Sequence, residues 1–293
     1  MSVTAQSSSP PKAVAFALSA ALLLPLVDGL VKELVQSYPV LFVAWARFAM
    51  MTVFLGVAVV ARLGWGVLRP RALGVQLARA SSAVVATGLF YAGLRSLPLG
   101  ESTAIMCLAP ALAAGLAHLL FGERASASQW TGIAASLVGA MLVIRPGGSI
   151  FTPAVILPFA GSLAFATYIL TSRVAGWRDD PRVTTFWTCL GGFLLFSLAL
   201  PFAWETSAVA SSWGMFALIG ALGALGQLAT AFAYRHGTTT MVAPIGYMSL
   251  VVAAVLGFIF FRDAITAITF IGMALIAIGG VLVIRGSMAA STA

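Results

Sequence analysis

Several polar side chains in this chain fall inside long apolar segments. Burying a polar group there costs free energy unless it has a polar partner or faces a cavity. Asp28 is the one carboxylate clearly within such a segment, so it could take up and release a proton. Thr87 and Gln227 each follow a small residue by four positions, Ala83 and Gly223 respectively, so each pair shares one helix face. Because polar groups in hydrocarbon tend to face a cavity or one another, these faces are candidate walls of a binding site.

Other residues on or near these faces could contact a small molecule. The first face continues through Gln76, Arg79, Phe90 and Tyr91, and the second through Thr230 and Tyr234. The aromatic residues that could stack against an apolar substrate, or simply pack against lipid or the protein core, are Trp45, Tyr168, Trp187 and Tyr247. Arg79 could attract an anionic group such as a carboxylate, although both Arg79 and Arg47 are long enough to reach the membrane interface. A simpler role for Thr87 and Gln227 is a hydrogen bond to a neighbouring helix.

Asp28 also has a structural interpretation. Lys32 follows it by four residues, the spacing at which opposite charges pair along a helix. The sequence therefore leaves two roles open for Asp28, a local ion pair with Lys32 and the uptake and release of a proton.

Prolines interrupt four of the apolar segments. Each proline removes a backbone N–H and permits a kink, which suits helices that line a cavity or move as hinges. The candidate hinges are Pro25, Pro110, Pro158 and Pro244.

The chain contains no recognisable enzyme signature. Its two histidines lack acidic partners, there is no His/Cys cluster and there is no phosphate-binding loop. We therefore expect no catalytic residue, no metal and no cofactor.

The composition is that of an integral membrane protein. The 293 residues are 61% apolar and only 8% charged, with a mean hydropathy of +1.04. A soluble protein needs far more surface charge than this. The net charge of +8 comes from cations dispersed among short loops, which reflects membrane topology rather than nucleic-acid binding. The two cysteines, Cys107 and Cys189, are expected to be apolar packing residues.

About 20 apolar residues are needed for a helix to cross a bilayer, and the sequence contains ten such segments. They are 13–31, 40–61, 72–94, 101–121, 128–145, 152–172, 183–202, 212–234, 239–261 and 265–285. We expect residues 1–12 to form a disordered tail and 286–293 a second tail. Arg and Lys are concentrated in the segments that lie inside if the N-terminus is cytoplasmic, which places both termini in the cytoplasm.

The chain repeats itself at an offset of 140 residues. Leu-Val-Ile-Arg occurs at 142–145 and again at 282–285, and Gly132 and Gly139 correspond to Gly272 and Gly279. Five spans in each half, 13–145 and 152–285, make the second copy enter the bilayer inverted, as in many transporters. The paired glycines lie on one face of spans five and ten, so we expect these spans to serve close packing or dimerisation.

This pattern resembles the EamA-type members of the drug/metabolite transporter superfamily. The resemblance rests on two five-span halves, Pro110 in span four, Phe-Gly-Glu-Arg at 121–124 and a glycine-rich fifth span. The second half fits with Phe-Arg-Asp at 261–263, but has Leu250 where the first has Pro110. The resemblance implies a basket-like bundle in which spans 1, 3, 4, 6, 8 and 9 surround the substrate and spans 5 and 10 lie outside.

Within this superfamily the chain is similar to aromatic amino acid exporters of the YddG type. We therefore expect an all-α bacterial inner-membrane secondary transporter that exports amino acids or related metabolites by alternating access, as a monomer or homodimer. Two alternatives are an exporter of lipophilic cations or drugs, disfavoured by the scarcity of embedded acids, and a membrane enzyme.

Overall fold

The fold is entirely helical where the structure describes it. The computed structural model describes residues 10–64, 69–70, 72–121, 127–144, 152–176, 180–202, 209–236, 242, 245–263 and 266–292. The first half consists of α1 (Pro10–Ser37), α2 (Val40–Leu63), α3 (Leu73–Leu94), α4 (Leu99–Met106), α5 (Ala109–Phe121) and α6 (Ala127–Ile144). The second half contains α7 (Ile156–Gly176), α8 (Pro181–Ala199), α9 (Val209–His236), α11 (Met248–Phe261) and α12 (Ala267–Thr292), with short 3₁₀ turns at Pro153–Val155 and Leu200–Phe202.

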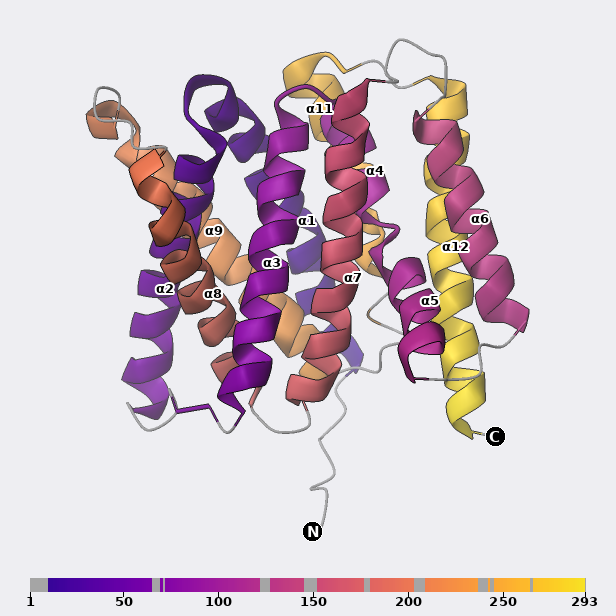
Figure 1. Ribbon diagram of the computed structural model, residues 1–293, viewed down its shortest axis with the longest axis horizontal. Coiled ribbons are helices and arrows are strands. Elements are labelled where there is room, and N and C mark those ends of the chain that lie inside the picture. The colour runs from indigo at the N-terminus through magenta and orange to yellow at the C-terminus, as the bar shows by residue number, and fades with distance from the viewer. Residues whose placement is uncertain are drawn as a thin grey trace.

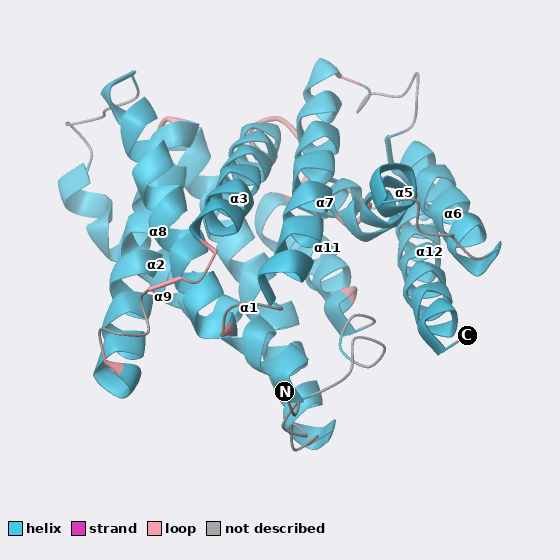
Figure 2. Ribbon diagram, turned by 60° about the horizontal axis from the view of Figure 1, so that its bottom comes forward, coloured by secondary structure: helices cyan, strands magenta, loops and turns pink. Residues whose placement is uncertain are grey.

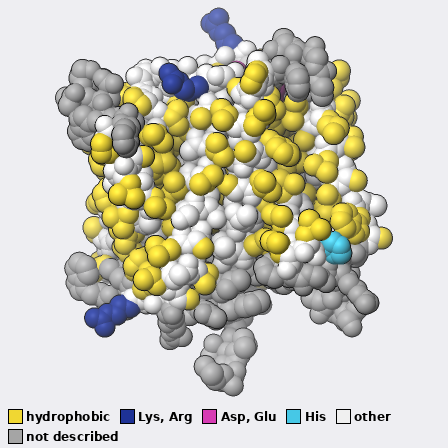
Figure 3. Space-filling model, viewed as in Figure 1, with side chains coloured by type: hydrophobic (Ala, Val, Ile, Leu, Met, Phe, Trp, Pro, Cys, Tyr) yellow, Lys and Arg dark blue, Asp and Glu magenta, His cyan; other side chains and the backbone are white. Residues whose placement is uncertain are grey.

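These helices form a transmembrane bundle, as the sequence predicts. Nine helical segments of the described chain are long and apolar enough to span a bilayer, and Met248–Phe261 is a shorter tenth. Large apolar side chains are exposed along the sides, among them Leu119 at 76% and Leu198 at 74%. On the face drawn in Figure 3, hydrophobic side chains cover the middle while Lys and Arg lie at the two ends. Such a surface suits lipid, not water.

Most helix ends differ from the predicted spans by a few residues, but the helix described within the predicted span 239–261 is shorter, at Met248–Phe261. Residues 1–9 of the expected N-terminal tail lie outside the described residues, and α1 already begins at Pro10. At the other end, α12 continues to Thr292, through most of the segment expected to be a tail. Helix propensity explains this extension, because the residues after Gly286 include Met and Ala and no proline.

The two halves pack against each other through equivalent helices. At the offset of the repeat, α1 corresponds to α7 and α3 to α9. Helix α1 packs along α9, and α3 packs along α7, so each pair joins one helix from each half. Helices α3 and α7 lie side by side at the front of Figure 1, with α1 and α9 behind them. The two halves thus meet through two sets of equivalent helix contacts.

The fourth span is broken into two helices. Helix α4 ends at Met106, the chain turns at Cys107, and α5 begins at Ala109 with Pro110 in its first turn. Cys107 has φ −67° and ψ −4°. Tyr247, 140 residues later, has φ −68° and ψ −13° and forms the turn before α11. The break therefore recurs in the second half, although Leu250 stands where the first half has Pro110.

Helices α6 and α12 form a separate pair at one edge of the bundle, side by side in both Figures 1 and 2. A Cβ atom added at Gly132 would lie 2.6 Å from the carbonyl oxygen of Gly279, and one at Gly139 would lie 2.6 Å from that of Gly272. The prediction that these glycines permit close helix packing is confirmed.

Candidate functional site

Arg47 lies in the interior of the bundle. It is carried by α2, and its side chain is only 8% exposed, so it does not extend to the membrane surface. Its Nη1 donates a hydrogen bond to the hydroxyl of Tyr91 on α3, and its guanidinium carbon lies 5.6 Å from the centroid of that ring. The charge of Asp28, which is half-buried on α1, also interacts with Arg47. Arg47 therefore links α2 to α3 and lies within electrostatic reach of Asp28 on α1.

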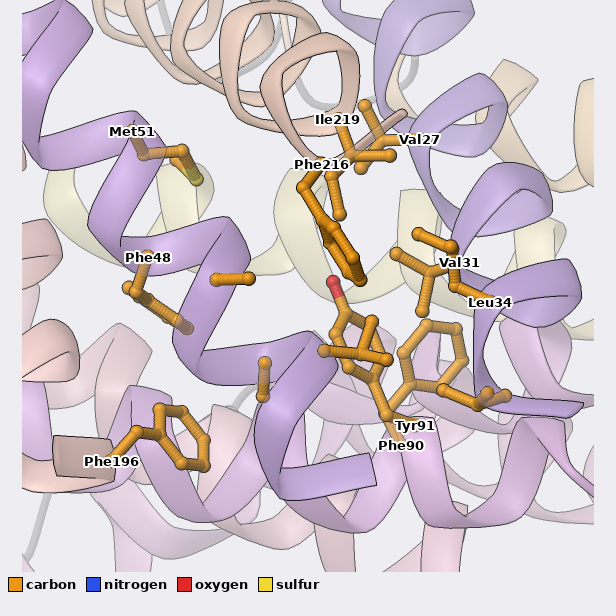
Figure 4. Close-up of a cluster of buried hydrophobic side chains, with 14 of the residues drawn as sticks. Val27, Val31, Leu34, Phe48, Met51, Phe90, Tyr91, Phe196, Phe216 and Ile219 are labelled. Atoms are coloured by element: carbon orange, nitrogen blue, oxygen red, sulfur yellow. The ribbon is translucent and has the colours of Figure 1, made fainter. Parts of the chain in front are cut away.

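The ring of Tyr91 is packed in a large apolar core, and its hydroxyl contacts Arg47. Figure 4 shows its ring between side chains of α1, among them Val31, and side chains of α2, among them Phe48. Tyr91 is fully buried, and so is Phe216 of α9 in the same cluster. The packing of this core positions the Tyr91 hydroxyl against the arginine.

Arg79 forms a second buried polar centre between the halves. It is 8% exposed on α3. Its Nε donates to Oγ of Ser172 at 2.8 Å, and its Nη2 donates to the hydroxyl of Tyr168 at 2.8 Å. Its guanidinium carbon also lies 4.8 Å from the centroid of the Tyr168 ring, close enough for a cation–π contact. Tyr168 and Ser172 are one turn apart on α7, so Arg79 links the two halves of the protein.

Cys189 of α8 lies near both arginines. It is 2% exposed, as expected of a packing residue. A Cβ added at Gly191 would meet Ala80, the neighbour of Arg79, and one at Gly192 would meet the ring of Phe48, the neighbour of Arg47. This stretch of α8 therefore packs against α2 and α3 beside both arginines.

The two predicted helix faces converge on Arg47. A Cβ added at Gly223 of α9 would lie 3.4 Å from Nε of Arg47, while on α3 the Tyr91 hydroxyl accepts a hydrogen bond from the same side chain. Thr87 is one turn before Tyr91 and Gln227 one turn after Gly223, on the same faces. Thr87 and Gln227 are both half-buried.

Other predicted site residues have varied surroundings. Gln76 is buried one turn from Arg79. Thr230 donates to the carbonyl of Gly226 in its own helix at 2.9 Å. The side chain of Tyr234 lies outside the described residues.

Two of the aromatic candidates pack away from the arginines. The indole Nε1 of Trp45 donates to Oγ of Ser197 on α8 at 2.9 Å. Tyr247 belongs to a second core cluster, where its hydroxyl contacts Gly280 of α12. Tyr168, by contrast, contacts Arg79.

The local ion pair considered for Asp28 does not form. Lys32 instead pairs with Asp263, with 2.8 Å between Nζ and Oδ2. Spacing along α1 suggested Asp28, but the packing of α1 against α11 brings Asp263 to Lys32. Asp28 interacts with Arg47 instead.

The predicted hinge prolines occupy different settings. Helix α1 continues through Pro25 without a break. Pro110 follows the break between α4 and α5, and the ring of Pro158 in α7 lies close to Gly93, where an added Cβ would be 2.9 Å from it. Pro244 lies outside the described residues.

Sequence reasoning missed Arg47 and Ser172 as members of the site. For Arg47 a signal existed, because an arginine about seven residues inside a span is expected either to reach the interface or to have a buried partner. For Ser172 there was none, since serines are common in membrane helices and only the pairing of α3 with α7 brings it to Arg79.

The sequence pattern of the EamA-like transporter family matches residues 11–145 and again residues 152–285. A riboflavin transporter of Rhizobium johnstonii is 28% identical over 233 residues, which are 78% of this chain and 75% of the relative. The pseudopaline exporter CntI of Pseudomonas aeruginosa is 21% identical over 276 residues, 93% of this chain and 95% of the relative. A protein of known crystal structure superposes with a TM-score of 0.63 at 22% identity, covering 94% of this chain and 96% of that one, which shows a shared fold.

The two family matches together cover almost the whole chain, one for each half of the bundle. The protein is thus a multi-pass membrane protein and a secondary transporter of small molecules, not an enzyme. With two copies of the family's repeat, one in each half of the helical bundle, the chain belongs to the EamA-like transporter family.

Proposed function

We propose that this protein exports amino acids, including aromatic ones, or closely related small metabolites across a bacterial inner membrane. Transport proceeds by alternating access, with both termini in the cytoplasm. The equivalent helix pairs α1–α9 and α3–α7 support this mechanism, because two interlocked halves can rock about a site between them.

The observation that carries the proposal is the position of Arg47. It lies between Tyr91 of the first half and Gly223 of the second, with Thr87 and Gln227 one turn away. Ionisable groups in the membrane interior usually mark a substrate or ion pathway. A buried guanidinium group beside apolar helix faces, with the half-buried ring of Tyr168 next to Arg79, suits a substrate that combines a polar head with an apolar or aromatic body.

The charges in this region disfavour the alternative of lipophilic cations. The guanidinium groups of Arg47 and Arg79 are both buried, and Asp28 is the carboxylate that interacts with Arg47. A site with this balance repels cations and attracts anions.

Riboflavin is a second candidate substrate. A relative that is 28% identical over most of the chain is a riboflavin transporter. The flavin ring is planar and aromatic, so it could contact the half-buried ring of Tyr168 as an aromatic amino acid would.

The proposal is tested by uptake into proteoliposomes that contain the purified protein. The labelled compounds are phenylalanine, tryptophan, leucine, glutamate and riboflavin. Thr87→Ala and Gln227→Ala are compared with Thr131→Ala and Gln36→Ala, which replace exposed residues of the same types. We expect saturable amino acid uptake that the first two substitutions reduce by about tenfold or more and the second two leave unchanged.

Uptake of riboflavin alone would assign the second candidate. Uptake of none of these compounds would overturn the amino acid proposal. Amino acid uptake that is equal in all four variants would place the site elsewhere in the bundle.

A further inference from the structure

The buried guanidinium groups of Arg47 and Arg79 keep part of their hydrogen-bonding capacity free. Arg47 uses Nη1 for Tyr91, but its Nε finds no acceptor among the described residues. Arg79 uses Nε and Nη2 for Ser172 and Tyr168, and within the same part of the chain its Nη1 has no acceptor. A buried donor without an acceptor is destabilising, so each arginine is suited to receive a further oxygen atom.

Charge balance indicates which kind of oxygen this is. The hydrogen-bond partners of Arg79 are neutral hydroxyl groups, and the described part of the chain contains one ion pair, Lys32–Asp263, which does not involve Arg79. Asp28 balances no more than the single positive charge of Arg47. The region therefore holds more positive than negative charge among the described residues, and a buried excess of charge calls for a counter-ion.

The two arginines also lie along the interface that transport would open. Arg47 faces Gly223 of the second half, and Arg79 is bound to α7 of the second half. Helix α8 packs against α2 and α3 beside both residues, since a Cβ added at Gly192 would meet Phe48 and one at Gly191 would meet Ala80. A substrate that moves between the halves would therefore pass both arginines.

We infer that Arg47 and Arg79 bind the anionic oxygen group, a carboxylate or a phosphate, of the transported substrate. The planar guanidinium group offers parallel N–H donors that match such groups, and it retains its charge when buried. This inference rests on the proposed transport function and specifies its substrate class. The apolar body of the substrate would then lie near Tyr168, whose half-buried ring adjoins Arg79.

Binding by the purified full-length protein in detergent tests the inference, with probes that differ only in the anionic group. One pair is phenylalanine and phenylalaninamide, and the other is riboflavin 5′-phosphate and riboflavin. We expect calorimetry to show that at least one anionic probe binds about tenfold or more tightly than its partner, the size of one charge-assisted hydrogen bond. Carboxylate binding and phosphate binding are distinguished by which pair shows the preference.

The preference should depend on the two arginines. In Arg47→Gln and Arg79→Gln we expect it to fall below about threefold, as for loss of a charged partner, whereas Arg95→Gln, at an exposed arginine, should keep it. Arg47→Lys keeps the charge without the planar donors, so it should fold like the wild type and retain an intermediate preference. Thermal unfolding and gel filtration of each variant separate loss of binding from loss of fold.

Two outcomes would overturn the inference. One is equal binding of both members of each pair, or binding by neither anionic probe. The other is a preference that survives both glutamine substitutions. A failure of the proposed transport function would give a different result. Selective anion binding without amino acid uptake would support the anion site and contradict the export of amino acids. Equal uptake of phenylalanine and phenylalaninamide would support the transport function and contradict the anion site.

Discussion

The ammonium group of Lys32 lies 2.8 Å from Oδ2 of Asp263, a residue 231 positions further along the chain. The same Oδ2 accepts the backbone N–H of Leu99, the first residue of α4, at 2.9 Å. Arg262, with φ 54° and ψ 29°, ends α11 in the left-handed conformation and directs Asp263 back toward these partners. One carboxylate thus ties together α1, α4 and α11 at one end of the bundle.

Loss of this ion pair should destabilise the protein. Both side chains are largely buried, at 9% and 16% exposure, so Lys32→Met or Asp263→Asn leaves a charge without its partner. We expect each single variant to lose about 3 kcal/mol of unfolding free energy. The double variant should lose less than the sum, as measured by thermal unfolding in detergent. Strictly additive losses would show that the two groups do not depend on one another.

The contact between Arg79 and Ser172 predicts different effects for two similar serines. Ser172 and Ser82 both donate to a backbone carbonyl four residues earlier, but only Ser172 accepts a hydrogen bond from Arg79. Ser172→Ala should therefore cost about 1–3 kcal/mol, and Ser82→Ala less than about 0.5 kcal/mol. Unfolding midpoints in detergent compare the two variants directly. Equal midpoints would remove the energetic importance of the Arg79 contact.

The pairing of α6 with α12 predicts that replacing Gly139 lowers the stability of the protein. A Cβ at this position would lie 2.6 Å from the carbonyl oxygen of Gly272, and backbone cannot move aside as a flexible side chain can. Gly139→Ala should separate the helices and cost about 1–3 kcal/mol. Gly115→Ala is the control, because an added Cβ there meets nothing within 4 Å and alanine favours the helix. We expect Gly115→Ala to match or exceed the wild-type midpoint, and a similar result for Gly139→Ala would contradict the packing argument.

Proton coupling through Asp28 remains a prediction. Asp28 interacts with Arg47, so a proton taken up by this carboxylate would change the charge that Arg47 presents to a substrate. Uptake driven by a pH gradient should therefore be lost in Asp28→Asn, while exchange without a gradient persists. Glu33→Gln, at an exposed residue of the same helix, should respond to the gradient like the wild type. An unchanged response in Asp28→Asn would exclude coupling through this residue.

Much of the fold could be read from local patterns. Runs of apolar residues predict the helices because about 30 Å of hydrocarbon requires a fixed helix length. The repeat predicts the two equivalent halves, and Gly132 and Gly139 with their counterparts predict the tight α6–α12 pair. The turn at Tyr247 is harder to predict. The equivalent turn at Cys107 is followed by Pro110, whereas the second half has Leu250 at the position of that proline.

The partners of the charged residues were decided by tertiary structure. The sequence determined that Asp28, Lys32, Arg47 and Arg79 lie in or beside the membrane, since hydropathy depends only on neighbours along the chain. Spacing favoured Lys32 for Asp28, yet the structure joins Lys32 to Asp263 and gives Asp28 to Arg47. A buried charge takes the partner that packing brings within reach, and the pairing of α1 with α11 and of α3 with α7 is not encoded in any single helix. Sequence thus determined which groups needed partners, and only the arrangement of helices determined which partners they found.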